Sequence, residues 1–585
     1  MFTQDLNPVG DSLTLSALCA AVPLITLFVL LGGLRVRAWV AGLVALVIAL
    51  AIAIVLFKMP VGQALLSATE GAAFGFFPIL WIVINAIWVY NLTVASGHFD
   101  VLRRSFEKVS PDQRIQAMII AFCFGALLEA LAGFGTPVAI SVVMLLALGF
   151  APLKAAVVAL VANTAPVAFG ALATPIVTLA EVTSGVSDAP GLTIDNLGAM
   201  VGRQTPLLAL FVPLILVYLV DGTRGLRQTW LPAIVCGLTF AVAQFLASNF
   251  VSVPLTDIIA ALAAAASVVV LLRVWQPAEV VAAEPSTASS AGGVGAGAPK
   301  GAVVGGGHDE EATVGSSSRS GVAAGQTGHG GPARDSGAEV ARAYAPYIVI
   351  IVIFSLTSLT AVKTFLGKEP FTFKFAWPGL DISNAAGTPL SSTMYTFNWL
   401  PAAGTLMIFA GIITAVILKL SPAQMAKTYV ATYVELKSAI ITVMAVLALA
   451  YVMNQSGQTV SLGAWLAGTG SAFAILSPIL GWIGVAVTGS DTSANALFGA
   501  LQVNTATQAG LDPVLLASAN TSGGVLGKMV SPQNLAIAAA AVGMAGQEGD
   551  IFRKVVGWSL GLLVVMCAIV ALQSTGVLGW MIPSP

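Results

Sequence analysis

A chain of 585 residues in which 57% are apolar and only 9% are charged does not have the composition of a soluble globular protein, because such proteins carry roughly 25% charged residues. Its net charge of −1 also leaves no overall basic field that would attract nucleic acid. The composition therefore indicates an integral membrane protein and excludes a soluble enzyme and a nucleic-acid-binding protein.

Apolar blocks long enough to cross a bilayer recur along the chain. A helix needs about 17–25 mainly apolar residues to cross a hydrocarbon core of about 30 Å. The first block starts near Leu13 and is followed by Arg35 and Arg37. Since a cleaved signal peptide has its positive charges before a shorter apolar run, we interpret this block as a transmembrane helix. The clearest predicted spans are residues 13–33, 38–57, 74–94, 205–220, 230–249, 255–274, 344–362, 401–420, 438–453 and 554–573.

The segment 115–150 predicts a re-entrant hairpin. Residues 117–131 would form a helix only about 22 Å long at 1.5 Å per residue, and residues 138–150 a shorter one. The run Ala-Gly-Phe-Gly-Thr-Pro at 132–137 separates them. Such a flexible, polar tip is tolerated at membrane depth only where it is buried in protein or lines a wet cavity.

The next block, 153–181, is long enough to cross but contains Asn163-Thr164-Ala165-Pro166. Pro166 has no backbone N–H to donate and disfavours helix at Ala165. This pattern predicts a helix that is broken in the middle of the membrane.

Residues 276–342 change abruptly to Gly, Ala, Ser and Pro. Such a stretch cannot bury enough apolar area to offset chain entropy, which predicts a disordered cytoplasmic linker. We interpret it as a passive tether, although an acidic low-complexity tract could also recruit a partner. It separates a first membrane half at 1–275 from a second at 343–585, where we expect another hairpin at 463–509 and another broken helix at 513–546, interrupted at 520–524.

Short motifs of the first half return in the second at one constant offset. Ala162-Asn163-Thr164, Gly170 and Thr174-Pro175 recur as Ala519-Asn520-Thr521, Gly527 and Ser531-Pro532. Lys and Arg in short loops mark the cytoplasmic side, which places the linker inside and the loop 363–400 outside. On that topology the two sets enter the membrane from opposite sides, which predicts an inverted repeat of the kind common in secondary transporters.

Broken helices and hairpin tips that meet near the midplane predict a site for a small anion. Their ends present partly charged backbone N–H groups suited to an anion, notably at Thr136 and Thr492. The alternative is that Gly and Pro merely kink tightly packed helices. The predicted substrate-binding residues are Gly135, Thr136, Asn163, Thr164, Ser490, Thr492, Asn520, Thr521 and Lys528.

Ionisable residues inside predicted membrane segments are rare without a partner or a function. Glu129 and Asp491 lie next to the two hairpin tips and are the predicted proton carriers, because burial favours the neutral form of a carboxyl group. Lys528 would be a charge partner for a carboxylate or for an anionic substrate, or alternatively a member of a purely structural ion pair. Arg203 is a secondary candidate, better explained as an anchor at the membrane interface.

Nothing in the sequence supports catalysis or a cofactor. There is no metal-ligand spacing, no phosphate-binding loop and no Ser/His/Asp or Cys/His grouping, and the four cysteines lie in apolar blocks without a short spacing. Without a nucleotide-binding element, uphill transport must be driven by an ion gradient.

Several long motifs resemble those of the bacterial L-lactate permease family, in the right order and in both membrane halves. They are Glu129-Ala-Leu-Ala-Gly-Phe-Gly-Thr-Pro-Val-Ala-Ile, Gly202-Arg-Gln-Thr-Pro, Thr488-Gly-Ser-Asp-Thr-Ser-Ala-Asn-Ala-Leu-Phe and Ala519-Asn-Thr-Ser-Gly-Gly-Val-Leu-Gly-Lys-Met-Val-Ser-Pro-Gln. The linker at 276–342 departs from the family pattern.

The resemblance implies proton-coupled uptake of L-lactate, with D-lactate and glycolate accepted, across a bacterial inner membrane. It also implies a wider group of transporters with inverted repeats, elevator-type movement and homodimeric assembly. That group carries Ser-Asn-Thr-like motifs, whereas both motifs here read Ala-Asn-Thr. The missing serine hydroxyl disfavours sodium and fits a proton better.

The resulting hypothesis is an all-α polytopic membrane protein with about 12–14 transmembrane elements, acting as a symporter for a monocarboxylate anion and a proton. Two alternatives stay open. One is a sodium-coupled carboxylate transporter of the same architecture, and the other is a membrane-embedded enzyme or sensor that uses the linker as its signalling element.

Overall fold

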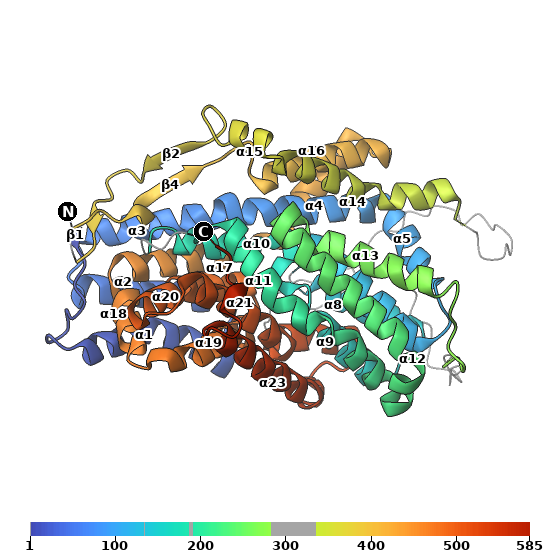
Figure 1. The fold of residues 1–585 in the computed structure, drawn as a ribbon. Coiled ribbons are helices and arrows are strands. Elements are labelled where there is room, and N and C mark those ends of the chain that lie inside the picture. The colour runs from blue at the N-terminus through green and yellow to red at the C-terminus, as the bar shows by residue number, and fades with distance from the viewer. Residues whose placement is uncertain (1, 134, 187–190, 282–334, 386, 585) are drawn as a thin grey trace, which may run out of the picture.

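The computed structural model describes residues 2–133, 135–186, 191–281, 335–385 and 387–584. Most of these residues are helical, and the helices pack side by side in a bundle (Figure 1). Within the described residues, ten helices are long and apolar enough to cross a membrane, and a bent pair adds an eleventh span. Two shorter apolar helices, Thr136–Ala147 and Ala403–Ile417, add to these. The predicted helical membrane fold is confirmed, whereas the inverted repeat remains a prediction.

In the described residues of the first half, the regular elements are helices apart from a short strand at the start. Its α-helices are α1 (Leu13–Phe28), α2 (Ala38–Val55), α3 (Val61–Phe74), α4 (Trp81–Ala95), α5 (His98–Glu107), α6 (Gln113–Gln116), α7 (Gly125–Ala132), α8 (Thr136–Ala147), α9 (Pro152–Ala162), α10 (Gly170–Thr183), α11 (Ile194–Ala209), α12 (Val212–Leu246) and α13 (Thr256–Leu271). A π-helical turn, Ala117–Phe124, joins α6 to α7.

The second half repeats this helical character. Its α-helices are α14 (Gly337–Ser358), α15 (Thr360–Leu366), α16 (Ala403–Ile417), α17 (Pro422–Gln455), α18 (Gln458–Ala467), α19 (Phe473–Thr488), α20 (Asp491–Ala509), α21 (Pro513–Gly527), α22 (Pro532–Ala541) and α23 (Glu548–Gln573). The predicted span 438–453 is the C-terminal part of α17, which is much longer than expected.

Four short strands lie at one end of the bundle. Strand β1 (Phe2–Thr3) pairs in parallel with β3 (Ile382–Ser383), and β2 (Phe373–Ala376) pairs antiparallel with β4 (Met394–Phe397). The chain leaves α13 and returns into α14 at the opposite end (Figure 1). The loop 363–400 and the two ends of the predicted linker are therefore at opposite ends of the molecule. Most of the predicted linker, 282–334, lies outside the described residues.

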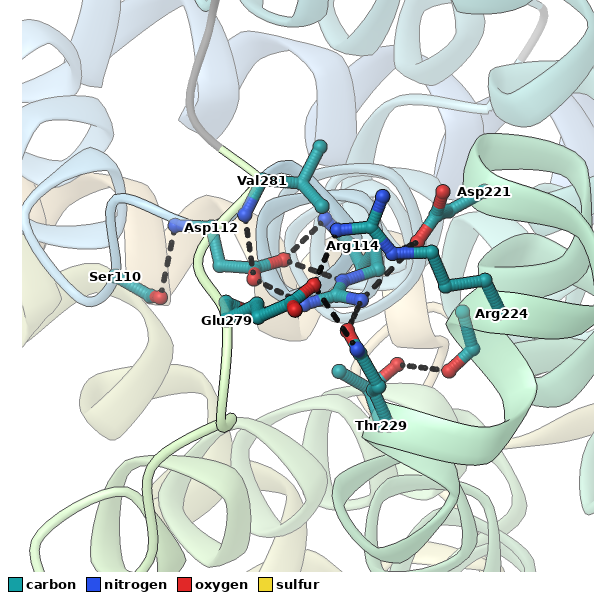
Figure 2. A network of polar contacts seen from close by, with 10 residues as sticks. Ser110, Asp112, Arg114, Asp221, Arg224, Thr229, Glu279 and Val281 are labelled. Atoms are coloured by element: carbon teal, nitrogen blue, oxygen red, sulfur yellow. Dashed lines mark hydrogen bonds and ion pairs between the residues drawn. The ribbon is translucent and has the colours of Figure 1, made fainter.

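The chain immediately before residue 282 is fixed by a buried arginine (Figure 2). The fully buried guanidinium of Arg114 pairs with Asp112 at 2.7 Å and with Asp221 at 3.1 Å. It also donates to the carbonyl oxygen of Glu279 at 2.6 Å, and the backbone N–H of Val281 donates to Asp112 at 3.1 Å. Residues 279–281 are thus fixed to the start of the first predicted hairpin.

The chain at residue 335 is held near the same end. Arg104 donates two hydrogen bonds to the carboxylate of Asp335, at 2.7 and 3.1 Å, and Lys108 lies 3.4 Å from it. The Arg104 hydrogen bond lowers the pKa of Asp335 to about 2, with help from Lys108. Because this folded pKa lies below the ordinary 3.8, the contact stabilises the folded state above about pH 4 and is lost as the pH falls towards 2.

An Asp335→Asn variant should loosen the start of α14 without affecting transport. The carboxylate that receives both cations would be lost, so trypsin should cleave faster at Arg342, which lies in the second turn of this helix. Asp195→Asn, which removes the exposed partner of Lys363, is the matched control and should leave cleavage at Arg342 unchanged. Equal cleavage of the wild type and Asp335→Asn would show that the contact does not hold this segment.

Two helical hairpins and one bent helix pair lie where the sequence places interruptions. Gly135 separates α7 from α8 with a φ of 87°, and Gly489 separates α19 from α20 with a φ of 75°. Both turns need glycine because a residue with a Cβ is disfavoured at such positive φ. The third interruption follows Asn163, where the helix pair 152–162 and 167–183 bends by 62°.

The predicted break at 520–524 is wrong. Helix α21 continues to Gly527, and the interruption follows at Lys528–Val530 before α22. The two glycines of the predicted break, Gly523 and Gly524, serve close packing instead. A Cβ on Gly523 would lie 2.1 Å from the carbonyl oxygen of Pro478 in α19, so these small residues let two helix backbones approach, as in many membrane helices.

Candidate functional site

A buried ion pair joins the two halves of the chain beside these interruptions. The Lys528 ammonium lies 2.5 Å from Oε1 of Glu129, and their side chains are only 8% and 3% exposed. Glu129 comes from α7 in the first hairpin, and Lys528 begins the 3₁₀ turn η9 (Lys528–Val530) after α21. Two predicted site residues that are 399 positions apart are thus in direct contact.

The interrupted first-half helix contributes to the same carboxylate. Asn163, at the C-terminal end of α9, donates from Nδ2 to Oε2 of Glu129 at 2.9 Å. Its buried Oδ1 has no hydrogen-bond partner among the described residues. The hydroxyl of the neighbouring Thr164 donates to the carbonyl oxygen of Val161. The break therefore leaves one buried acceptor, the Asn163 oxygen, next to the ion pair.

Glycines make the space for the Glu129 carboxylate. A Cβ on Gly170 would lie 2.9 Å from Oε1 of Glu129, and one on Gly133 would lie 3.3 Å from the same atom. The three residues after Gly170, Ala171–Ala173, have φ values of 44°, 56° and 59°. This left-handed conformation costs about 1–2 kcal/mol per residue, and such strain gathers at functional sites. The sequence repeat aligns Ala171–Ala173 with the irregular turn Lys528–Val530.

Asp491 approaches this group from the second hairpin. It is the first residue of α20, is 3% exposed, and neither carboxylate oxygen has a hydrogen-bond partner among the described residues. A Cβ on Gly524 would lie 2.4 Å from its Oδ1. Lys528 follows the last residue of α21 with helical backbone angles and comes four residues after Gly524, so the two positions face the same side of the helix. Asp491 therefore lies on the side of α21 from which Lys528 extends.

The two hairpin tips both rest on α22. A Cβ on Gly135 would lie 2.3 Å from Ile537, and one on Gly489 would lie 2.5 Å from Gln533. The backbone N–H of Thr136 donates to the carbonyl oxygen of Gly133 at 3.3 Å, and its role in anion binding stays a prediction. The hydroxyl of Ser490 accepts from the backbone of Ser493 and caps α20, whose second residue is Thr492.

Asn520 and Thr521 are buried in an unbroken helix, and their polar atoms are occupied. Asn495 of α20 accepts from both at 2.8 and 3.0 Å and itself donates to the carbonyl oxygen of Pro175 in α10. Asn520 also accepts from Gln502 at 3.0 Å. Two helical turns, roughly 12 Å at 1.5 Å per residue, separate Asn520 from Lys528. This second Asn-Thr pair thus positions α20 and α10 beside the site.

Arg203 belongs to a different set of contacts. It donates to the side chain of Asn249 at 2.9 Å and to the carbonyl oxygen of Met581 at 2.6 Å. These bonds tie α11 to the end of α12 and to the C-terminal segment. The prediction of Arg203 as a secondary substrate-binding residue is not supported by these contacts.

Sequence reasoning missed a third carboxyl group near the ion pair. Asp257 in the first turn of α13 is fully buried, and α13 packs against α7, the helix that carries Glu129. Its Oδ1 accepts from Nε2 of Gln244 at 3.2 Å, and its Oδ2 has no hydrogen-bond partner among the described residues. An acidic residue inside the predicted span 255–274 could have indicated a functional carboxyl group. Because it lies in the first helical turn, where a carboxylate ordinarily stabilises the helix, the sequence also offers a structural explanation for it.

The site thus combines one ammonium, from Lys528, with the carboxyl groups of Glu129, Asp491 and Asp257. Among the described residues, no three His, Cys, Asp or Glu side chains are grouped so that they could hold a metal ion. The arrangement has the chemistry to exchange protons and to hold a small anion.

Comparison with known proteins gives the family. Residues 16–576 match the profile of the L-lactate permease family. An L-lactate permease of Bacillus subtilis (strain 168) is 41% identical over 602 aligned residues, with 100% of both chains covered. A glycolate permease of Escherichia coli (strain K12) is 40% identical over 583 residues, with 98% of each chain covered.

A solved structure, the YdaH transporter of Alcanivorax borkumensis, aligns over 86% of each chain at 12% identity, with a TM-score of 0.42. The full-length relatives and the ten candidate spans within the described residues indicate a multi-pass transporter of the bacterial plasma membrane. With its family profile matched over nearly all of its length, the chain belongs to the L-lactate permease family.

Proposed function

We propose that this protein is a proton-coupled symporter that takes up L-lactate and related 2-hydroxy monocarboxylates such as D-lactate and glycolate. The observation that carries the proposal is the pairing of Lys528 with Glu129 at 2.5 Å, with Asp491 and Asp257 nearby. The names of the relatives, L-lactate permease and glycolate permease, support the class of substrate.

Charge explains why an anion would enter with a proton. With all three carboxyl groups ionised, the single ammonium of Lys528 leaves the buried site with an excess of negative charge. Coulomb repulsion is strong in a medium of low dielectric constant, so such a site would reject a carboxylate. Protons bound at these carboxyl groups remove the repulsion. Anion and proton therefore stabilise each other in the site, which is the physical basis of symport.

An exchange of ion-pair partners would bind the substrate. When a proton binds Glu129, the Lys528 ammonium is released from it and pairs with the substrate carboxylate. The unpartnered Oδ1 of Asn163 then accepts a hydrogen bond from the 2-hydroxyl group. When the proton leaves towards the cytoplasm, Glu129 regains Lys528 and the substrate is released. A buried polar acceptor of this kind discriminates strongly against an acid that lacks the hydroxyl group.

Transport into proteoliposomes tests the proposal. An inward proton gradient should drive accumulation of labelled L-lactate, glycolate should compete, and an uncoupler should abolish accumulation. Propionate, which lacks the 2-hydroxyl group, should compete poorly. Accumulation driven by a sodium gradient alone, with no response to the uncoupler, would overturn proton coupling and favour the sodium-coupled alternative.

A further inference from the structure

The Asp257 carboxyl group is not part of the Glu129–Lys528 ion pair, although its helix packs against the helix that carries Glu129. Asp257 lies in the first turn of α13, which packs against α12 and α7. Glu129 and Lys528 are the charged groups that interact with it, and the neutral amide of Gln244 faces it from α12. Among the described residues, Asp257 forms no ion pair and its Oδ2 has no hydrogen-bond partner.

A carboxyl group in these surroundings is more stable in its neutral, protonated form than as a carboxylate. Burying an ionised carboxylate without a partner costs several kcal/mol even after relaxation, and one hydrogen bond from an uncharged amide offsets only part of that cost. The Lys528 ammonium is engaged 2.5 Å from Glu129. These surroundings favour the neutral form of Asp257, with the proton on the oxygen that does not accept from Gln244.

The same amide connects Asp257 to the interrupted helix. Nε2 of Gln244 donates to the carbonyl oxygen of Ala165 at 3.3 Å, and Oε1 of Gln244 accepts from the hydroxyl of Thr205 at 3.4 Å. Ala165 and Thr205, together with Thr164, line a cavity of about 10 Å³, close to the space that one water needs. Any movement of the helix break that accompanies substrate binding changes the contacts of Gln244, and through them the stability of the proton on Asp257.

We propose that Asp257 is a further proton-binding site, whose proton is bound and released during each transport cycle in addition to the proton that the Glu129–Lys528 pair exchanges. The inference rests on the proposed symport. With the substrate bound and Glu129 protonated, loss of the Asp257 proton would add a buried negative charge that competes with the substrate for the Lys528 ammonium. Binding of the anion therefore requires Asp257 to be neutral, and release of the anion is favoured when Asp257 ionises.

The proton-to-lactate ratio tests this inference. It is measured in proteoliposomes, with the membrane potential clamped at zero, as the ratio of internal to external L-lactate at which net flux stops at a fixed pH difference. The wild type should transport at least two protons per lactate, and Asp257→Asn should transport one fewer while retaining lactate exchange between loaded and external pools. Glu70→Gln is the matched control, because Glu70 is also fully buried, with one oxygen hydrogen-bonded to Gln455 and one without a partner in the described structure.

Each outcome decides between the claims. A wild-type ratio of one overturns the further proton but leaves the proposed symport intact, and a ratio of zero overturns both. An unchanged ratio in Asp257→Asn, a loss of exchange together with accumulation, or an equal fall in Glu70→Gln would each show that Asp257 does not carry a transported proton. The wild-type measurement stays decisive even if the Asp257→Asn protein does not fold.

Discussion

Lys528→Met should reduce L-lactate uptake by at least about 100-fold. The substitution removes the ammonium that receives the substrate carboxylate. Loss of one partner of a buried charge pair costs about 3 kcal/mol or more of binding free energy, which corresponds to a factor of at least about 100. The substitution also leaves the Glu129 carboxylate buried without its ammonium, which destabilises the fold. Initial uptake rates, normalised to the amount of folded protein in the membrane, measure the effect.

The double variant Glu129→Gln with Lys528→Met separates a functional role of the pair from a purely structural one. Removing both charges leaves no unpaired buried ion, so thermal stability should return close to that of the wild type. Uptake should stay absent because the ammonium is missing. Recovery of uptake together with stability would mean that the pair only fixes packing, as in the structural alternative for Lys528.

Gly170→Ala should produce the second large loss. The added Cβ would meet Oε1 of Glu129 at 2.9 Å and its Cγ at 3.1 Å, both closer than normal van der Waals contact. The carboxylate must then shift away from Lys528 and Asn163, and a misplacement of about 1 Å can cost on the order of 100-fold in activity. We therefore expect uptake to fall by about one to two orders of magnitude, while the protein still inserts and folds.

Gly557→Ala on α23 is the control for that substitution. A Cβ at Gly557 meets nothing within 4 Å, and this helical position has no positive φ. Uptake by Gly557→Ala should equal that of the wild type. If Gly170→Ala were equally active, the position of the Glu129 carboxylate would not matter for transport, and the role assigned to the ion pair would be wrong.

Local sequence signals predicted the interruptions whose cause is local. Pro166 has no backbone N–H to donate, so the bend after Asn163 follows from one residue type. The turns at Gly135 and Gly489 follow from the need for positive φ. Gly523 and Gly524 also look like a helix break in the sequence, but they are needed for close packing. Atoms of α19 and of Asp491 occupy the space that side chains at these two positions would fill. Whether a glycine makes a turn or allows close packing depends here on a neighbouring helix, whose position the sequence alone does not give.

The composition of the site was only partly predictable, for a similar reason. Charges inside apolar segments identified Glu129, Asp491 and Lys528, because each is costly in a bilayer without a partner. Their mutual arrangement depends on contacts across almost 400 positions. Asn520 and Thr521 matched the repeat, yet their amide and hydroxyl groups bind Asn495 rather than the ion pair. Asp257 was not predicted, because its position in the first turn of α13 has an ordinary structural explanation and its contact with Gln244 of α12 is not visible in the sequence.

Proton uptake on binding of the substrate tests most directly the central claim, that the buried carboxyl groups admit an anion only together with protons. Purified protein in weakly buffered detergent solution would be titrated with L-lactate while the pH of the solution is recorded. We expect each bound lactate to withdraw at least one proton from solution, and its affinity to weaken as the pH rises. Binding without any proton uptake, at an affinity that does not change with pH, would contradict the claim.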